Sequence, residues 1–298
     1  MPIPERDLAT MANIGAQVTS KDTYRTVRLA LEAPNTGYSG KAYEIFLQGS
    51  YGNDTNVFRE SDVDVVIRLD AIFSYDLAAL AAEQQAAFAA THGAATYTHA
   101  QFRNDVLAAL RSRFGDDVLP GNKAVAIAAS HNRRKADVII AIQHRRYLWY
   151  VSDRPDQNSY VPGISFRKAD GTRVINYPGQ HRANLTEKNQ RTNEWFKHIV
   201  RIFKNARQKM VENGYILAGN APSYYLEGLL YNVPNDCFGT SYADSMVACI
   251  NWLYETDRSQ YLCANEQYPL LDGNPDVTWR STECTTFLQG IVALWDGW

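Results

Sequence analysis

Two aspartates at the start of an apolar segment constrain this chain more than any other feature. Asp62 and Asp64 flank Val63 and open a Val-rich run that we predict to be a β-strand. Residues i and i+2 of a strand point to the same face, so the two carboxylates project side by side. Carboxylates this close repel one another unless a cation lies between them. Oxygen ligands at this spacing suit Mg²⁺ or Mn²⁺, which bind carboxylates together with substrate phosphates.

A Gly-Ser turn precedes this pair of carboxylates. Gln48, Gly49 and Ser50 lie at the end of an apolar strand that we expect over residues 43–49. Because glycine has no Cβ, such a turn can bring backbone N–H groups and a hydroxyl close to a phosphate. Ser50 is the expected phosphate donor, although a simple turn would have the same composition. Gln48 either contacts a phosphate or a base, or is an exposed strand residue. The turn and the two carboxylates together predict a metal-dependent site for nucleoside triphosphates.

A third carboxylate lies in a later apolar segment. Asp137 is part of the predicted strand Ala136–Ile140, where a charged group is costly without a partner. A metal ion would be one such partner. The alternative is a salt bridge to one of three preceding cations, Arg133, Arg134 or Lys135.

Two helical segments supply further candidates for nucleotide contact. Lys204 shares a helix face with Lys197 and Arg201, at spacings of i, i+4 and i+7, and such a basic face is usually just solvated. Ser223 is expected at a helix start, where N–H groups and the helix dipole favour a phosphate and where plain N-capping is the alternative. Tyr224 is expected to stack on a nucleobase, although one of two adjacent tyrosines could equally belong to the core.

The order of these motifs resembles that of the DNA polymerase β-type nucleotidyltransferase superfamily. The narrower resemblance is to the bacterial cGAS/DncV-like nucleotidyltransferases, and it covers roughly residues 40–230. The residues that carry it are, in chain order, Gly49-Ser50, Ser61-Asp62-Val63-Asp64, Asp137, Ile202-Phe203-Lys204 and Pro222-Ser223-Tyr224. The resemblance implies that Asp62, Asp64 and Asp137 are catalytic metal ligands, and that Lys204 neutralises the triphosphate.

The same resemblance implies an enzyme that joins nucleoside triphosphates, ATP and/or GTP, into a cyclic di- or trinucleotide second messenger. A cyclic GMP-AMP is one such product, and the family acts in anti-phage defence. Of the two metal ions, one would lower the pKa of the attacking ribose hydroxyl and the other would stabilise the triphosphate and the leaving pyrophosphate. The resemblance also implies an enzyme that is either constitutively active or regulated by protein partners.

Two other functions remain open from the sequence. A nucleotidyltransferase of this superfamily could act on another acceptor, such as an antibiotic, a tRNA or a protein. A catalytically inactive protein could bind nucleotide as a sensor, although the complete set of three acids argues against it.

Charge and composition exclude other classes of function. The net charge is −2, but the segment from Glu212 to the end contains eleven acidic residues and only two basic ones, Arg258 and Arg280. Such an acidic segment would repel a long duplex, so we expect no DNA or RNA activator. No apolar run of membrane-spanning length and no signal-peptide core is present, which predicts a cytoplasmic protein without a membrane partner. The four cysteines lack C-x-x-C spacing and are expected to be reduced and packed.

The predicted fold class is α+β: a polymerase β-like sheet with flanking helices and a helical C-terminal lobe, bilobed with a central cleft. We expect a catalytic core over residues 1–180 and the helical lobe over residues 181–298. Before the lobe, helices are expected over residues 20–31, 75–91 and 102–114. Strands are expected over 43–49, 63–69, 123–129, 136–142 and 145–151, with a hairpin of 160–168 and 172–177 around Asp170-Gly171.

Overall fold

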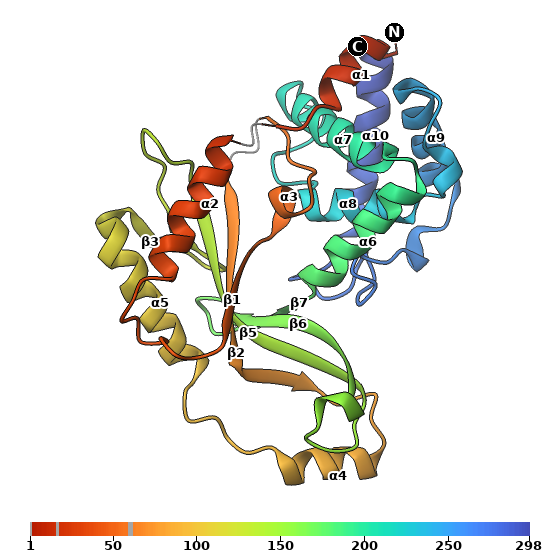
Figure 1. Ribbon diagram of the computed structural model, residues 1–298. Helices are drawn as coiled ribbons and strands as arrows, with labels where there is room; N and C mark the ends of the chain where they lie inside the picture. Colours follow the sequence, from red (N-terminus) through yellow and green to blue (C-terminus); the bar gives the residue numbers. More distant parts are fainter. Residues whose placement is uncertain (1, 16–17, 59–61) are drawn as a thin grey trace. The chain divides into compact units, whose positions relative to one another are not determined.

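The chain folds into two compact units. The computed structural model describes residues 2–15, 18–58 and 62–298 (Figure 1), so Ser61 of the second strand motif lies outside the described residues. One unit, here called the sheet unit, comprises Val18–Leu47 and Ser61–Pro178. The other, the helical unit, comprises Met1–Gln17, Gln48–Glu60 and Gly179–Trp298.

The sheet unit is built on a seven-stranded mixed sheet, counted over the described residues. Strands β1, β2, β5, β4 and β3 lie side by side in that order, and β6 pairs with both β5 and β7. Strands β2 and β5 are parallel, and the other pairs are antiparallel. The strands are β1 (Tyr43–Leu47), β2 (Val63–Asp76), β3 (Val118–Pro120), β4 (Val125–Ile127), β5 (Ala136–Trp149), β6 (Ser159–Arg167) and β7 (Arg173–Asn176).

The two central strands are longer than the sequence suggested. β2 continues to Asp76, and after an irregularity its segment 73–76 pairs with residues 143–146 of β5. The helix predicted from Tyr75 is therefore wrong over its first part, since α4 begins only at Ala82. β5 is also one strand where two were predicted. In both cases ladder pairing between long neighbours overrides local sequence preference. The predicted hairpin around Asp170-Gly171 is confirmed by the β6–β7 pairing.

Helices α2 (Val18–Leu31) and α5 (His99–Phe114) pack together on the sheet, against β2 and β5 (Figure 1). Their apolar stripes are buried through Val27 and Leu31 of α2 and through Phe102 and Leu110 of α5. Thr98 caps α5, because its hydroxyl accepts a hydrogen bond from the Gln101 N–H. The remaining helical segments of this unit are α4 (Ala82–Thr91), η1 (Gly115–Asp117) and η2 (Pro155–Gln157).

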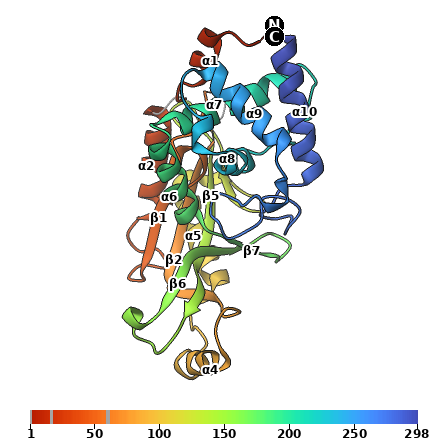
Figure 2. The ribbon, with the colours of Figure 1, turned by 90° about the vertical axis from the view of Figure 1, so that its right-hand side faces the viewer.

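The helical unit is organised around α7, which contacts α1, α8, α9 and α10 (Figure 2). Its helices are α1 (Glu5–Met11), α3 (Gly49–Gly52), α6 (Pro178–Arg191), α7 (Trp195–Glu212), α8 (Ser223–Asn232), η3 (Asn235–Cys237), α9 (Tyr242–Glu255), η4 (Arg258–Gln260) and α10 (Ser281–Gly297). Among the described residues, no helix combines the length and the apolar character needed to cross a membrane.

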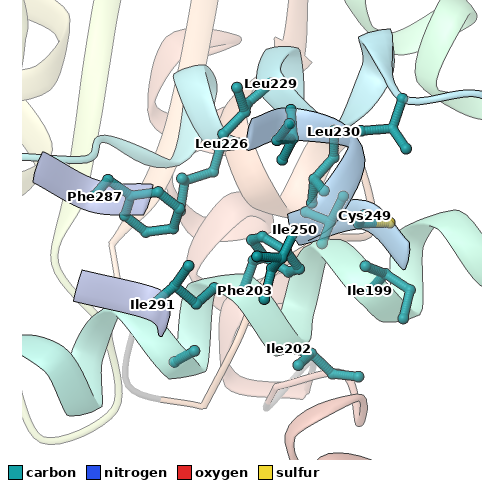
Figure 3. Packing of buried hydrophobic residues seen from close by; sticks show 14 of the residues in the cluster. Ile199, Ile202, Phe203, Leu226, Leu229, Leu230, Cys249, Ile250, Phe287 and Ile291 are labelled. Atoms are coloured by element: carbon teal, nitrogen blue, oxygen red, sulfur yellow. The ribbon is translucent and has the colours of Figure 1, made fainter. Parts of the chain in front are cut away.

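A large apolar cluster fills the helical unit. Figure 3 shows side chains of α7, α8, α9 and α10 interlocked, including Phe203, Leu226, Ile250 and Ile291, which are all buried. Each such side chain contributes about 1.5–3 kcal/mol when it is taken fully out of water. Cys249, which belongs to this cluster, is free and buried, as predicted for a packed thiol.

The division into units refines the predicted domain boundary. The chain passes from one unit to the other between Pro178 and Gly179, close to the predicted residue 180. Two earlier segments, residues 1–17 and 48–60, lie within the predicted catalytic core but group with the helical unit. Ile3 and Leu8 show the reason for the first segment, since both are buried in the apolar cluster of the helical unit.

Candidate functional site

The three predicted acids lie on the two central strands of the sheet unit. Asp62 immediately precedes β2, Asp64 lies in β2, and Asp137 lies in β5. The parallel register places Asp64 directly opposite Asp137. Val63 and Val65 are fully buried whereas Asp64 is partly exposed, so the predicted alternation of the two faces is present. The structure thus brings the acids to the same end of neighbouring strands.

A lysine links two of these carboxylates. The Lys135 ammonium donates to Asp62 Oδ2 over 2.6 Å and to Asp137 Oδ2 over 3.2 Å. These interactions raise the pKa of Lys135, chiefly through the hydrogen bond to Asp62 and against the cost of its burial. The structure therefore contains the salt bridge that the sequence offered as an alternative for Asp137. Arg133 has a different partner, since it pairs with Asp117.

The donor set fits a hard divalent cation, although its carboxylates are not gathered around one point. Among the described residues, no three His, Cys, Asp or Glu side chains converge closely enough to form a metal-binding cluster. Asp62 and Asp137 nevertheless share one cation, the Lys135 ammonium, and their oxygens are ligands that Mg²⁺ and Mn²⁺ prefer. The pair is thus arranged around a positive charge, and its donor atoms are of the kind that a hard divalent cation prefers.

The Gly-Ser turn belongs to the helical unit and forms one short helical turn, α3. Gln48 is extended and precedes the turn, and Gly49 begins it with φ = 65°. This left-handed conformation costs an L-residue about 1–2 kcal/mol and costs glycine little. Gln48 Oε1 is buried and has no hydrogen-bond partner among the described residues. Ser50 is partly exposed, and its carbonyl accepts the Thr55 N–H over 3.0 Å.

A buried ionic network anchors the segment that follows this turn. Glu227 of α8 accepts hydrogen bonds from Asn53 Nδ2 (3.0 Å), Thr55 Oγ1 (2.5 Å), Lys204 Nζ (2.9 Å) and the His181 ring (2.7 Å). Burial alone would raise the pKa of Glu227, but the Lys204 ammonium and the hydrogen bonds outweigh burial and hold it well below its usual range. The network ties the Gly-Ser segment to α6, α7 and α8.

This network defines the surroundings of Lys204. The alternative interpretation of a solvated basic face is wrong, because Lys197 and Arg201 are buried and Lys204 has no exposed surface. Lys197 pairs with Asp54, and Arg201 donates to backbone carbonyl groups. In this arrangement the Lys204 ammonium is the counterion of Glu227, and triphosphate binding by Lys204 stays a prediction.

Ser223 and Tyr224 lie at the start of α8, as predicted. Pro222 occupies the N-cap position, so Ser223 is the first helical residue and does not cap the helix. The Ser223 hydroxyl instead accepts a hydrogen bond from Arg207 over 3.1 Å. The Tyr224 ring stacks on His181 with 4.7 Å between ring centroids, and burial raises its pKa. One ring face of Tyr224 is thus covered by His181 of the same unit.

Sequence reasoning missed the roles of two residues in the helical unit. Glu227 is the central acceptor of the buried network, and Arg207 is the cation beside Ser223. Both had a signal in the sequence, since Glu227 interrupts an apolar helix and Arg207 lies one helical turn from Lys204. For Lys135, the sequence named Asp137 as a possible partner but not Asp62.

The ion pair of Lys204 and Glu227 should dominate the stability of the helical unit. Lys204→Met should lower the free energy of unfolding by about 3–5 kcal/mol, because it leaves a buried carboxylate without its counterion. The double variant Lys204→Met, Glu227→Gln should lose less unfolding free energy than the two single variants lose in sum. Chemical denaturation measures this cycle. In the matched cycle on the exposed pair Lys209 and Glu212, each change should cost less than about 1 kcal/mol. Additive losses at the buried pair would contradict the assignment.

The depressed pKa of Glu227 predicts how stability depends on pH. A carboxyl group with a lowered folded-state pKa stabilises the protein above its unfolded pKa of about 4.3, and this contribution is lost as the pH falls further. The difference in unfolding free energy between wild type and Glu227→Gln should therefore narrow from about pH 6 to about pH 3. Denaturant titrations across this range provide the measurement, and a constant difference would show that Glu227 is not the titrating group.

Comparison with known proteins places these features in a family. Residues 183–296 match the family described as the cGAS/DncV-like nucleotidyltransferase C-terminal helical domain. The chain is 38% identical over 300 residues to the cyclic UMP-AMP synthase of Rhodothermus marinus, with 100% of this chain and 99% of the relative covered. It is 36% identical over 304 residues to the cyclic nucleotide synthase CdnE01 of Staphylococcus haemolyticus, and both chains are covered completely.

A solved structure agrees with these matches. The Rhodothermus marinus CdnE c-UMP-AMP synthase, determined with Apcpp and Upnpp, superposes with a TM-score of 0.87 and 37% identity, covering 100% of this chain and 98% of the other. The protein is thus a nucleotidyltransferase. It belongs to the cGAS/DncV-like nucleotidyltransferases, a family whose matching members are cyclic nucleotide synthases, and the resemblance and fold class predicted from the sequence are confirmed.

Proposed function

We propose that the protein joins two nucleoside triphosphates into a cyclic dinucleotide. The observation that carries this proposal is the register of β2 and β5, which sets Asp64 opposite Asp137 in a chain that matches cyclic nucleotide synthases along its full length. Two structures in the comparison hold triphosphates or their analogues: the Rhodothermus marinus enzyme with Apcpp and Upnpp, and the Elizabethkingia meningoseptica enzyme with GTP and Apcpp. They support nucleoside triphosphates as substrates.

The proposed mechanism depends on the three acids of the sheet unit. Asp62, Asp64 and Asp137 would hold Mg²⁺ or Mn²⁺. A bound divalent cation would neutralise triphosphate charge and lower the pKa of the attacking ribose hydroxyl. From the helical unit we assign phosphate binding to Gly49 and Ser50. The positive φ of Gly49 lets the backbone turn sharply before Ser50, whose side chain is partly exposed.

Three further residues are proposed to contact the nucleotide. Gln48 has a buried side-chain oxygen without a described partner, which suits a residue that completes its hydrogen bonding on a ligand. Ser223 opens α8 beside the Arg207 guanidinium, and a cation there favours phosphate over an uncharged ligand. Tyr224 remains our candidate for base stacking, through the ring face that His181 does not cover.

The names of the relatives guide the choice of bases. They include a cyclic UMP-AMP synthase, cyclic dipyrimidine synthases and a cyclic dipurine synthase. Because the UMP-AMP enzyme matches the whole chain, we propose ATP and UTP as the first substrate pair. The second pair is ATP and GTP, which would give the cyclic GMP-AMP that the family resemblance suggested. We further propose that the product is a second messenger of anti-phage defence in the cytoplasm, made without a nucleic-acid activator.

The purified protein should form a phosphatase-resistant product from ATP, UTP and Mg²⁺ or Mn²⁺ alone. Ring closure leaves no terminal phosphate, so resistance to phosphatase distinguishes a cyclic product from a linear one. Incubation with all four labelled triphosphates, followed by phosphatase treatment and mass spectrometry, identifies the bases. Linear products only, or transfer to an added antibiotic, tRNA or protein, would support the alternative acceptors. Product only after addition of DNA or RNA would refute the proposed independence from nucleic acid.

The double variant Asp62→Asn, Asp64→Asn should lose activity by about 10²–10⁴-fold, because metal ligands supply several kcal/mol of charge stabilisation in the transition state. Its unfolding midpoint should stay close to that of the wild type. Asp70→Asn is the matched control, since this carboxylate lies on β2 and pairs with Arg68. Full turnover by the double variant would exclude these acids as catalytic ligands.

A further inference from the structure

Lys135 occupies an unusual position relative to two proposed metal ligands. It lies two residues before Asp137, so both side chains project to the same face of the sheet. Its backbone is fixed there, because the Lys135 carbonyl accepts the Val63 N–H over 3.0 Å. Its ammonium lies within 3.2 Å of one oxygen each of Asp62 and Asp137.

A divalent cation and this ammonium compete for the same two carboxylates. Mg²⁺ binds oxygen ligands at about 2.0–2.1 Å in near-ideal octahedral geometry. With the ammonium on Asp62 and Asp137, no three His, Cys, Asp or Glu side chains of the described residues form a metal-binding cluster. A cation bound between the two carboxylates would lie where the Lys135 ammonium lies and would repel it.

The lysine side chain is suited to such displacement. Its side chain is 42% exposed, so solvent can receive the ammonium when it leaves the two carboxylates. A lysine is a point charge on a flexible four-carbon stem, whereas an arginine holds carboxylates through a rigid two-pronged contact. A divalent cation without nucleotide brings no anionic group with which the displaced ammonium could pair. A triphosphate brings several anionic oxygens, which are new partners for it.

We propose that Lys135 is an intramolecular competitor for the catalytic divalent cation, which makes metal binding weak in the absence of nucleotide and couples it to the arrival of a triphosphate. This inference rests on the proposed function, in which Asp62, Asp64 and Asp137 hold the metal. Lys135 is a positioning residue in this scheme, because it acts through the carboxylates.

Binding of Mn²⁺ to the nucleotide-free protein tests the competition directly. Lys135→Met should bind Mn²⁺ roughly ten- to hundredfold more tightly than the wild type, the range expected when a charge-assisted contact no longer opposes binding. Lys135→Gln should behave in the same way, and Lys135→Arg, which keeps the charge, should remain weak. Isothermal titration calorimetry or electron paramagnetic resonance of free Mn²⁺ gives the affinities. Arg154→Met, which removes one positive charge from an exposed pair with Asp156, should leave Mn²⁺ affinity unchanged.

The same titration in the presence of Apcpp tests the coupling. The analogue should increase Mn²⁺ affinity strongly in the wild type and less in Lys135→Met, because the variant has no ammonium to relocate. Unfolding midpoints establish that each variant is folded. Affinity for Mn²⁺ alone that is unchanged or weaker in both Lys135→Met and Lys135→Gln would overturn the competition.

The double variant Asp62→Asn, Asp64→Asn separates the two proposals. If it loses Mn²⁺ binding while Lys135→Met gains none, the competition fails and the proposed metal site stands. If it binds Mn²⁺ as well as the wild type does, the assignment of the metal ligands fails, and the inference drawn from it fails too.

Discussion

The parallel pairing of β2 and β5 is the constraint on which the proposed chemistry depends. Parallel strands run in the same direction, so residues near their beginnings meet at one end of the sheet, and a fixed register decides which side chains face each other. A slip of one residue would turn Asp64 and Asp137 to opposite faces. The buried valines of β2 oppose this slip, because it would move Val63 or Val65 to the partly exposed position that Asp64 occupies. Burial of these valines therefore helps to keep the register that sets Asp64 opposite Asp137.

The two units differ in how far their clustered charged side chains are exposed to solvent. In the sheet unit, the carboxylates and Lys135 remain partly exposed, so their contacts can be exchanged at modest cost. In the helical unit, Glu227 and Lys204 are completely enclosed, and loss of either partner leaves a buried charge. We interpret the first arrangement as suited to substrate chemistry and the second as suited to holding a backbone segment in place.

The sequence predicted most of the strand segments, the same-face aspartates and the helical C-terminal part, because these depend on local spacing and alternation. It did not predict the length of β2, since the segment around Tyr75 is held in the ladder by a distant strand that local propensity does not register. It also did not show that Lys204 is buried. A basic stripe on a helix usually indicates a solvated face, and only the chain segment around Asp54 and Thr55, which packs against it, shows that this stripe is buried. Contacts between residues so far apart in the sequence cannot be read from spacing.

Glu227, which holds the segment after the Gly-Ser turn, has a consequence for folding during translation. Asn53 and Thr55 are held by Glu227, more than half the chain later, while every strand of the described sheet ends before the helical unit resumes at Gly179. On the ribosome, all strands are thus available for pairing before the acceptor that fixes the Gly-Ser segment has been translated. A nascent or truncated chain that ends before α8 has every predicted metal ligand and still lacks the residue that holds the proposed phosphate-binding turn in place.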